Sequence, residues 1–225
     1  MTSLAKGAIG LGGLGTVAGG GLLAHSLAKG DQKSALIKKL ESDKFTILNL
    51  DTSKQESENS GWQKIFLGYS SLSDGKENRK IGNLTLSASG DKREGINQLK
   101  KACSSLLNTE GDSSNFEKNY QLATQWCVEP VSIESLLQKQ GTPFLDTGAN
   151  NNQGWTEVAK AYEKAQSNTN KPLNEVTWSS VSNSNYDANI TNIKNACNTR
   201  KTKSSHEEGF LNALKEAQSW CTSRA

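Results

Sequence analysis

The 225-residue chain is long enough for one large domain or for two domains of about 100 residues each. Only 34% of its residues are hydrophobic and its mean hydropathy is −0.63, but 26 basic and 23 acidic residues nearly balance, which argues against wholesale disorder. The net charge of +3 is not gathered into a basic stripe, so we expect no nucleic-acid partner.

The chain begins with an uncharged, glycine-rich segment. Residues 7–28 contain no Asp, Glu, Lys or Arg, and eight of these 22 residues are glycine. A helix of this length spans about 33 Å, close to the roughly 30 Å hydrocarbon core of a bilayer, and glycine is common in membrane helices. We therefore predict that residues 1–30 form an apolar helical anchor that crosses a membrane once, through residues 7–28.

Two other interpretations of this segment stay open. Lys6 and the small residues at 24–28 also suit a signal peptide that is removed during export, and a glycine-rich soluble tail would have the same composition. The GxGxxG pattern of residues 10–15 follows only nine residues, whereas a dinucleotide-binding fingerprint needs a strand before it. We therefore expect no cofactor.

Lysines on either side of the segment bear on its orientation. Lys6 precedes it, whereas lysines at positions 29, 33, 38, 39 and 44 follow it. Under the positive-inside rule this difference would keep the body of the chain in the cytoplasm. The cysteines favour export instead, and long domains can translocate against a local charge bias. We expect the protein at the cell membrane with its body outside.

After this segment the sequence repeats with a period of about 94 residues, which indicates a tandem duplication. The repeated motifs are Gly61-Trp62 and Gly154-Trp155, Cys103 and Cys197, and Trp126-Cys127 and Trp220-Cys221. We predict two modules, residues 31–130 and residues 131–225, which meet at the proline-containing residues 128–131.

Apolar residues at helical spacing predict about four helices in each module, so the fold class is mainly α. In the first module these apolar stripes comprise Leu36, Ile37 and Leu40; Trp62, Ile65, Phe66, Tyr69 and Leu72; Ile96, Leu99, Ala102, Cys103 and Leu106; and Phe116, Tyr120, Ala123 and Cys127. In the second they comprise Ile133, Leu136 and Leu137; Trp155, Val158, Ala159, Tyr162 and Ala165; Ile190, Ile193, Ala196 and Cys197; and Phe210, Leu214, Ala217 and Cys221.

Local markers accompany these helices. The tripeptide Leu-Asp-Thr occurs at residues 50–52 and 145–147, ahead of the Trp-led helix of each module. Ser-x-x-Glu patterns at residues 114–117 and 205–208 predict capping boxes at the start of the last helix. A long connection joins the second and third helices, where residues 84–86 are compatible with a short strand or with a packed loop.

Four cysteines form two equivalent pairs. The duplication favours one disulfide within each module, Cys103–Cys127 and Cys197–Cys221, between consecutive antiparallel helices. Closing a loop of about 25 residues would stabilise each module by roughly 3–4 kcal/mol. The alternative is four buried free thiols.

No metal ligand and no catalytic residue is expected among the cysteines and histidines. The cysteines lack the CxxC spacing of zinc sites, and neither His25 nor His206 has a counterpart in the other copy. Cys127 and Cys221 fall near helix C-termini, whereas a catalytic thiolate needs a nearby histidine or a helix N-terminus.

Repeated aromatic residues are interpreted as scaffold. They are Trp62, Tyr69 and Trp126 in the first module and Trp155, Tyr162 and Trp220 in the second. Trp126 and Trp220 stand beside cysteines, which favours packing against a disulfide. The alternative is that these two side chains are exposed anchors for a partner.

Several short motifs are distributed over the whole chain: Ala5-Lys6-Gly7-Ala8-Ile9-Gly10-Leu11, Leu145-Asp146-Thr147, Trp155, Ala196-Cys197 and Trp220-Cys221-Thr222, with their first-copy equivalents. In these motifs the chain resembles large paralogous families of uncharacterised proteins in haemotropic mycoplasmas. The first copy departs in Val128 after its Trp-Cys pair and in a Lys/Ser-rich insertion before Trp62. The resemblance implies a membrane-associated or surface-exposed protein that varies among paralogues, no enzyme, and no known binding residues.

These features predict a non-catalytic, membrane-anchored surface protein. The chain has no HExxH, GxSxG or P-loop motif, so we expect no catalytic residue. Contact with a host-surface protein, or antigenic variation, would involve the unmatched loops at residues 73–94, 166–189 and 198–205. The alternative is a cytoplasm-facing, membrane-tethered scaffold, which would carry reduced cysteines. The sequence specifies neither a ligand nor an oligomeric state.

Overall fold

A computed structural model describes residues 33–72, 75–148, 153–166 and 173–223 of the chain. All of the regular elements in these ranges are helical, which confirms the mainly α fold class. The predicted anchor at residues 7–28 lies outside the described residues. Within the described part, no helix combines the length and apolar character needed to cross a bilayer.

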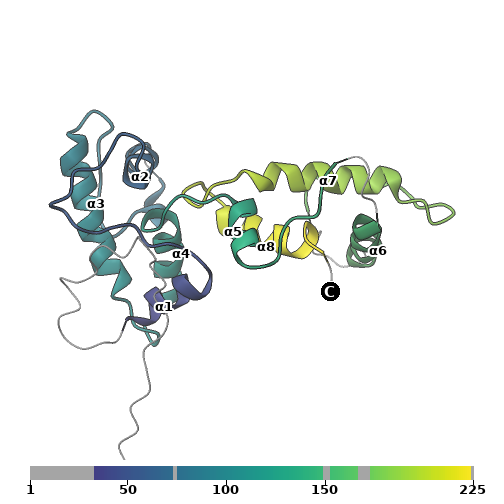
Figure 1. The fold of residues 1–225 in the computed structure, drawn as a ribbon, viewed down its shortest axis with the longest axis horizontal. Helices are drawn as coiled ribbons and strands as arrows, with labels where there is room; N and C mark the ends of the chain where they lie inside the picture. The colour runs from purple at the N-terminus through teal and green to yellow at the C-terminus, as the bar shows by residue number, and fades with distance from the viewer. Residues whose placement is uncertain (1–32, 73–74, 149–152, 167–172, 224–225) are drawn as a thin grey trace, which may run out of the picture.

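The helices fall into two sets at opposite ends of an elongated body (Figure 1). The first set contains α1 (Ala35–Ser42), α2 (Gly61–Ser70), the short 3-10 helix η1 (Glu77–Arg79), α3 (Lys92–Leu107) and α4 (Phe116–Trp126). The second contains α5 (Ile133–Lys139), α6 (Gln153–Gln166), α7 (Asp187–Lys201) and α8 (Phe210–Trp220). We call residues 33–130 the N-terminal half and residues 131–223 the C-terminal half. In each half the long third helix packs against the helix before it and the helix after it.

The first helix of each half starts at a serine cap. Ser34 Oγ accepts a hydrogen bond from the Ile37 N–H, and Ser132 Oγ accepts one from the Ser135 N–H. A serine cap of this kind stabilises a helix by about 1 kcal/mol. The residues that the two helices bury are Leu36, Ile37 and Leu40 in α1 and Ile133, Leu136 and Leu137 in α5.

An antiparallel bridge links the segment after the first helix to the end of the last helix in each half. The bridged pairs are Ile47 with Val128 and Phe144 with Thr222. The Leu48 N–H donates to the Cys127 carbonyl, and the Leu145 N–H donates to the Cys221 carbonyl. Leu145 therefore corresponds to Leu48 and not to Leu50. The two Leu-Asp-Thr tripeptides therefore do not occupy equivalent positions in the two halves but are displaced by two residues. The equivalent positions are those whose N–H donates to the carbonyl of the second cysteine.

The capping-box prediction is wrong in both halves. α4 begins at Phe116 without a side-chain cap, and α8 begins after Gly209, whose φ of +75° is a conformation that glycine adopts without strain. Ser205 is buried, and its hydroxyl accepts a hydrogen bond from the Val131 N–H. A tertiary contact therefore occupies the hydroxyl that the pattern assigned to a cap.

The long connection after the second helix is a packed loop in the described residues of both halves. In the N-terminal half it contains η1, and Leu84 and Leu86 pack against the core without forming a strand. In the C-terminal half a bridge between Ser182 and Asn185 closes a tight exposed turn. The packed-loop alternative is therefore the correct one for residues 84–86.

The faces that helical spacing predicted form the hydrophobic core. Along α2, Trp62, Ile65, Phe66 and Tyr69 are at most 2% exposed. Along α6, Trp155, Val158, Ala159 and Tyr162 are at most 1% exposed. Since burial of a large apolar side chain contributes about 1.5–3 kcal/mol, these two rows are a major source of stability in a chain with modest apolar content.

Substitution of two helical glycines by alanine should have different effects on the free energy of unfolding. Alanine is favoured over glycine by about 1 kcal/mol inside a helix. A Cβ at Gly95 would overlap the buried ring of Phe66, whereas a Cβ at Gly68 would make ordinary contacts of 3.4 Å with His206 and 3.5 Å with Trp126.

In urea unfolding followed by circular dichroism, we expect Gly95→Ala to lower stability by roughly 1–3 kcal/mol. We expect Gly68→Ala to leave stability unchanged or to raise it by up to about 1 kcal/mol. Similar effects of the two substitutions would show that Phe66 does not restrict residue 95.

Candidate functional site

A disulfide lies at the centre of each half. Cys103 in α3 is joined to Cys127 after α4, and Cys197 in α7 is joined to Cys221 after α8, with a Cα–Cα distance of 5.6 Å in both cases. All four cysteines are 0% exposed. The predicted pairing is therefore confirmed, and the alternative of four free thiols is not the state of this structure.

Each disulfide adjoins a tryptophan that meets a tyrosine edge to face. The Tyr69 and Trp126 ring centroids are 5.0 Å apart at 72°, and those of Tyr162 and Trp220 are 5.0 Å apart at 71°. Trp126 is fully buried, so it is a core residue and not an exposed anchor, whereas Trp220 is only partly buried. T-shaped aromatic pairs of this kind add about 0.5–1.5 kcal/mol beyond the burial of their area.

The two tyrosine hydroxyls hold the long connections onto the helices. Tyr69 donates to the Leu84 carbonyl and accepts from the Ile81 N–H. Tyr162 donates to the Leu173 carbonyl and accepts from the N–H of the same residue. Burial raises the pKa of both tyrosine hydroxyls, so they remain protonated donors.

The Trp-led helices are held in the same way in both halves. The Trp62 indole N–H donates to the Asn49 carbonyl over 2.7 Å, and the Trp155 indole N–H donates to the Asp146 carbonyl over 2.7 Å. A buried indole N–H needs a partner, and here that partner is the segment just after the antiparallel bridge. The six predicted aromatic positions therefore form internal contacts around the two disulfides.

Two buried lysines at equivalent places were missed by the sequence interpretation. Lys100 is 0% exposed, and its ammonium donates to the Asp51 carbonyl over 2.7 Å and to Glu56 Oε1 over 2.6 Å. Lys194 donates to the Gly148 carbonyl over 2.9 Å and lies above the Trp155 ring. Both lysines interrupt an apolar stripe, and they lie 94 residues apart, as do Cys103 and Cys197. This spacing was the signal that would have identified them.

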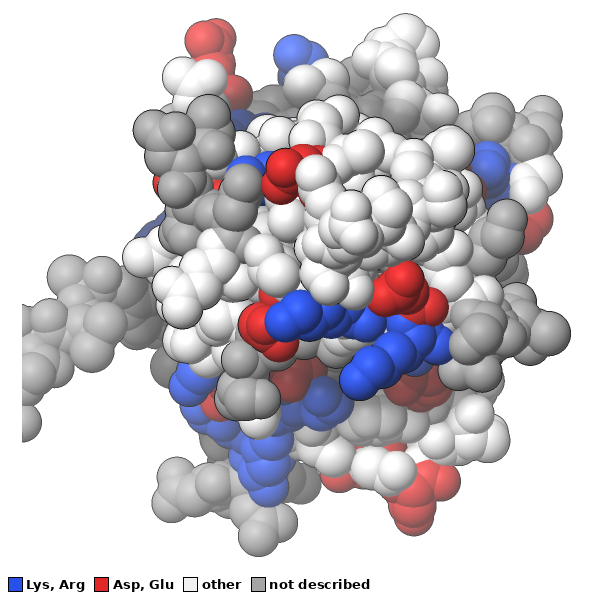
Figure 2. Space-filling model, turned by 90° about the vertical axis from the view of Figure 1, so that its right-hand side faces the viewer, with Lys and Arg blue, Asp and Glu red and all other residues white. Residues whose placement is uncertain are grey.

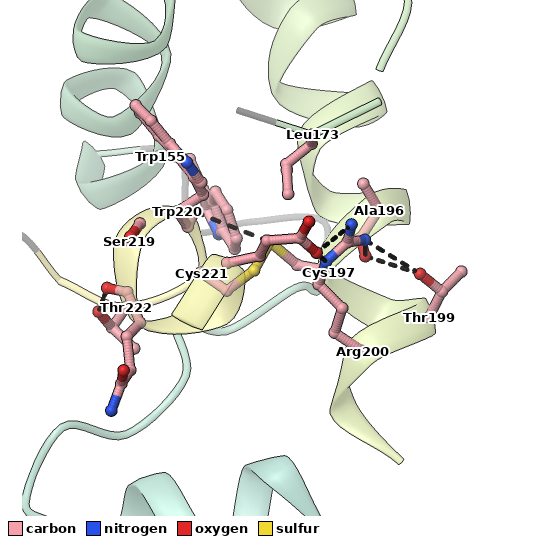
Figure 3. Close-up of a disulfide and its surroundings, with 12 residues drawn as sticks. Trp155, Leu173, Ala196, Cys197, Thr199, Arg200, Ser219, Trp220, Cys221 and Thr222 are labelled. Atoms are coloured by element: carbon pink, nitrogen blue, oxygen red, sulfur yellow. Dashed lines mark hydrogen bonds and ion pairs between the residues drawn. A yellow bond between two sulfur atoms is a disulfide. The ribbon is translucent and has the colours of Figure 1, made fainter. Parts of the chain in front are cut away.

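An arginine beside the second disulfide marks a difference between the halves (Figure 3). The Arg200 guanidinium forms ion pairs with Glu175 and Glu216 and also donates to the Ala196 carbonyl. The Arg200 hydrogen bond lowers the pKa of Glu175, which keeps this carboxylate charged. The residue 94 positions earlier is Leu106, which is buried in the core.

The loop before α8 joins the two halves. The His206 carbonyl accepts from Gln125 Nε2 over 3.0 Å and from Arg79 Nη2 over 3.4 Å. Glu208 forms ion pairs with Lys76 at 2.9 Å and with Arg79 at 3.2 Å. We call this set of contacts the junction.

The loops predicted to carry function differ in their structural roles. Residues 198–201 belong to α7, and Ser205 is buried at the junction, so residues 198–205 are not a free loop. Residues 75–94 contain η1, which also contributes to the junction. Residues 177–186 carry no charged side chain and lie at the far end of the C-terminal half. Figure 2 shows the molecule from this end.

Charged side chains of both signs lie next to one another on the end of the molecule shown in Figure 2, beside a broad uncharged area. In the described part of the chain, no three His, Cys, Asp or Glu side chains are grouped so that they could hold a metal ion. Comparisons with protein-family models, with curated proteins and with solved structures find no match to this chain. The resemblance to the families of haemotropic mycoplasmas therefore stays a prediction.

Lys100→Met should destabilise the N-terminal half strongly. Removal of the ammonium leaves the Glu56 carboxylate, whose side chain is 17% exposed, without its cation, and it leaves the Asp51 carbonyl without its donor. Breaking a buried ion pair in this way costs about 3 kcal/mol. The exposed neighbour Lys101→Met is the control and should change the urea unfolding free energy by less than about 0.5 kcal/mol. If the double variant Lys100→Met/Glu56→Gln is no more stable than Lys100→Met, the unpaired carboxylate is not the cause.

Protonation of His206 should weaken the folded state. Burial lowers the pKa of this imidazole, while Glu207 opposes the shift and Lys64 and Arg79 add to it. The pKa of this imidazole in the unfolded chain is about 6.5. Below that pH the unfolded state binds more protons than the folded state, so the stability that comes from the neutral form of His206 is lost as the pH falls.

Urea unfolding of the wild type and of His206→Gln at pH values from 7.5 to 5 measures this effect. The difference in unfolding free energy between the two proteins should shrink or change sign as the medium is acidified, because only the wild type loses stability through His206. A constant difference over the whole range would show that His206 does not contribute.

Proposed function

We propose that this chain is a non-catalytic, membrane-anchored surface protein whose body lies outside the cell and consists of two copies of one helical module. The module would act as a scaffold that presents a recognition surface to host molecules. Residues 7–28 would anchor it, either as a retained helix or as a signal that directs export.

The matching contacts support the duplication. In both halves a disulfide, a Trp–Tyr pair, a capped first helix and a buried lysine occur in the same order along the chain. The N–H groups of Leu36 and Ile133 also donate to equivalent carbonyls, those of Thr109 and Lys203. Contacts conserved between halves at this level of detail are what a duplicated module would retain.

The observation that carries the proposal is one fully buried disulfide in each half. Disulfides persist in secreted and surface proteins and are rare in the cytosol, where thiols are kept reduced. Small modules with little apolar surface also gain most from such crosslinks. Export therefore explains why a chain of this composition contains two of them.

The repeated residues support a role in binding and not in catalysis. The tryptophans, tyrosines, lysines and cysteines that recur in both halves form hydrogen bonds, ring contacts and disulfides within the protein. The contacts of the junction and most of the long connections have no counterpart in the other half, and connections are the regions where a binding protein varies.

A cytoplasm-facing scaffold is the second candidate, and the lysines at positions 29, 33, 38, 39 and 44 favour it under the positive-inside rule. The thiol state in intact cells separates the two candidates, because a cytosolic body would be kept reduced.

We expect non-reducing peptide mass spectrometry to find both disulfides in protein taken from intact cells. Cells would be quenched in acid, and free thiols would be alkylated with N-ethylmaleimide under denaturing conditions that expose buried cysteines. Linked peptides Cys103–Cys127 and Cys197–Cys221 are the expected result.

Cys103→Ser is the control, since it leaves Cys127 as a free thiol that the alkylation must detect. Labelling of intact cells with a membrane-impermeant amine reagent should modify exposed lysines of the C-terminal half such as Lys160. Four alkylated cysteines in the wild type, with no surface labelling, would contradict the proposal and favour the cytoplasm-facing scaffold.

A further inference from the structure

The junction encloses a cleft of about 400 Å³ that both halves line. Its walls come from η1 and α4 in the N-terminal half and, in the C-terminal half, from residues 205 and 207–209 together with residues 210–212 at the start of α8. A volume of this size is within the range of small-molecule binding sites, about 300–1,000 Å³.

Two buried polar atoms at this cleft lack a hydrogen bond of normal geometry within the described protein. They are the Nε of Arg79 and the Oγ1 of Thr124, a residue that is only 1% exposed. The Thr124 hydroxyl is still close enough to the Tyr120 hydroxyl to oppose the rise in the pKa of that tyrosine. The two terminal nitrogens of Arg79 each donate one hydrogen bond, to Glu208 and to the His206 carbonyl, whereas its Nε–H makes none. Buried polar groups are normally hydrogen-bonded, and two such groups beside one cleft indicate a missing polar partner.

The charges at the cleft select against an anion. Arg79 and Lys76 supply two positive charges and both pair with Glu208, while Glu207 supplies a second negative charge, so the four charges cancel. A phosphate or carboxylate group would therefore meet no net positive potential. The missing partner is a neutral group that can accept from an N–H and also donate to or accept from a hydroxyl.

The remaining lining suits a ligand rich in hydroxyl groups. Asn78, Gln121, Gln125 and Asn212 place four side-chain amides around the cleft. Each amide offers a donor and an acceptor, as does each sugar hydroxyl. Leu122, Phe210 and Leu211 add an apolar wall against which the C–H face of a sugar ring can pack.

We propose that this cleft binds a neutral carbohydrate of one or two sugar rings, with a hydroxyl group of the sugar accepting from Arg79 Nε–H and bonding to Thr124 Oγ1. This inference rests on the proposed role as a binding module but not on the location of the protein. Because the ligand contacts both halves, binding also stabilises the junction.

Nuclear magnetic resonance of the full-length, oxidised chain tests the proposal directly. The protein would be held in a detergent without a sugar headgroup, since such headgroups would compete. The probes are glucose, galactose, mannose, N-acetylglucosamine and lactose, each titrated to about 20 mM. The readout is the ¹⁵N–¹H signal of Arg79 Nε, assigned with the Arg79→Lys variant, and at least one sugar is expected to shift it in a saturable manner.

Thr124→Val separates a binding role from a structural one, because valine has the same shape but no hydroxyl. We expect the affinity for the responding sugar to fall tenfold or more while the urea midpoint stays the same or rises. Asn212→Ala, at an exposed position of α8, should also weaken binding. Thr222→Val is the matched control, since its hydroxyl donates to the Gln218 carbonyl at the opposite end of α8 and it should retain full affinity.

No saturable shift with any of the five sugars overturns the proposal, as does unchanged affinity in both Thr124→Val and Asn212→Ala. A shift produced by inorganic phosphate alone would also overturn it, because it would show that the site prefers an anion. If no sugar binds but both disulfides are present in cells, the carbohydrate site is rejected and the proposed surface role is unaffected. Reduced cysteines in cells reject export whatever the sugars do.

Discussion

The structure of each half depends on the disulfide that joins the end of its last helix to the helix before it. A disulfide fixes α3 to the end of α4 and α7 to the end of α8, and the carbonyl of the second cysteine then accepts the N–H of Leu48 or Leu145. That hydrogen bond sets the position of the segment whose carbonyl receives the Trp62 or Trp155 indole. The Trp-led helix is therefore placed by a sequence of contacts that starts at the sulfur atoms.

Much of this arrangement follows from local sequence patterns. Helical periodicity identified the four helices of each half, because an amphipathic helix buries residues three and four positions apart. The spacing of the cysteines identified the correct pairs. The start of α8 was misplaced, because the pattern around Ser205 cannot show that Val131 will occupy its hydroxyl. The same limit hid Lys100, whose role depends on a loop that is 49 residues away in the chain.

The junction was the least predictable part of the molecule. It combines residues that have no repeated counterpart, chiefly His206 and Glu208 on one side and Arg79 on the other. A period in the sequence draws attention to residues that the two halves share, whereas contacts between the halves depend on residues that they do not share. Only the folded arrangement brings η1, α4 and the loop before α8 together around one cleft.

Neither disulfide crosses the junction, and this has a mechanical consequence. Between the described halves, the contacts include ion pairs, side-chain hydrogen bonds and a ring contact between Phe45 and Phe210, in addition to the continuous chain near residue 130. Under tension between the two ends, these weak contacts separate first, while covalent bonds keep the 24-residue intervals within each half closed. The protein would lengthen by opening like a hinge before either half loses its core, so a pulling force would reach the shared cleft before it reached the scaffold.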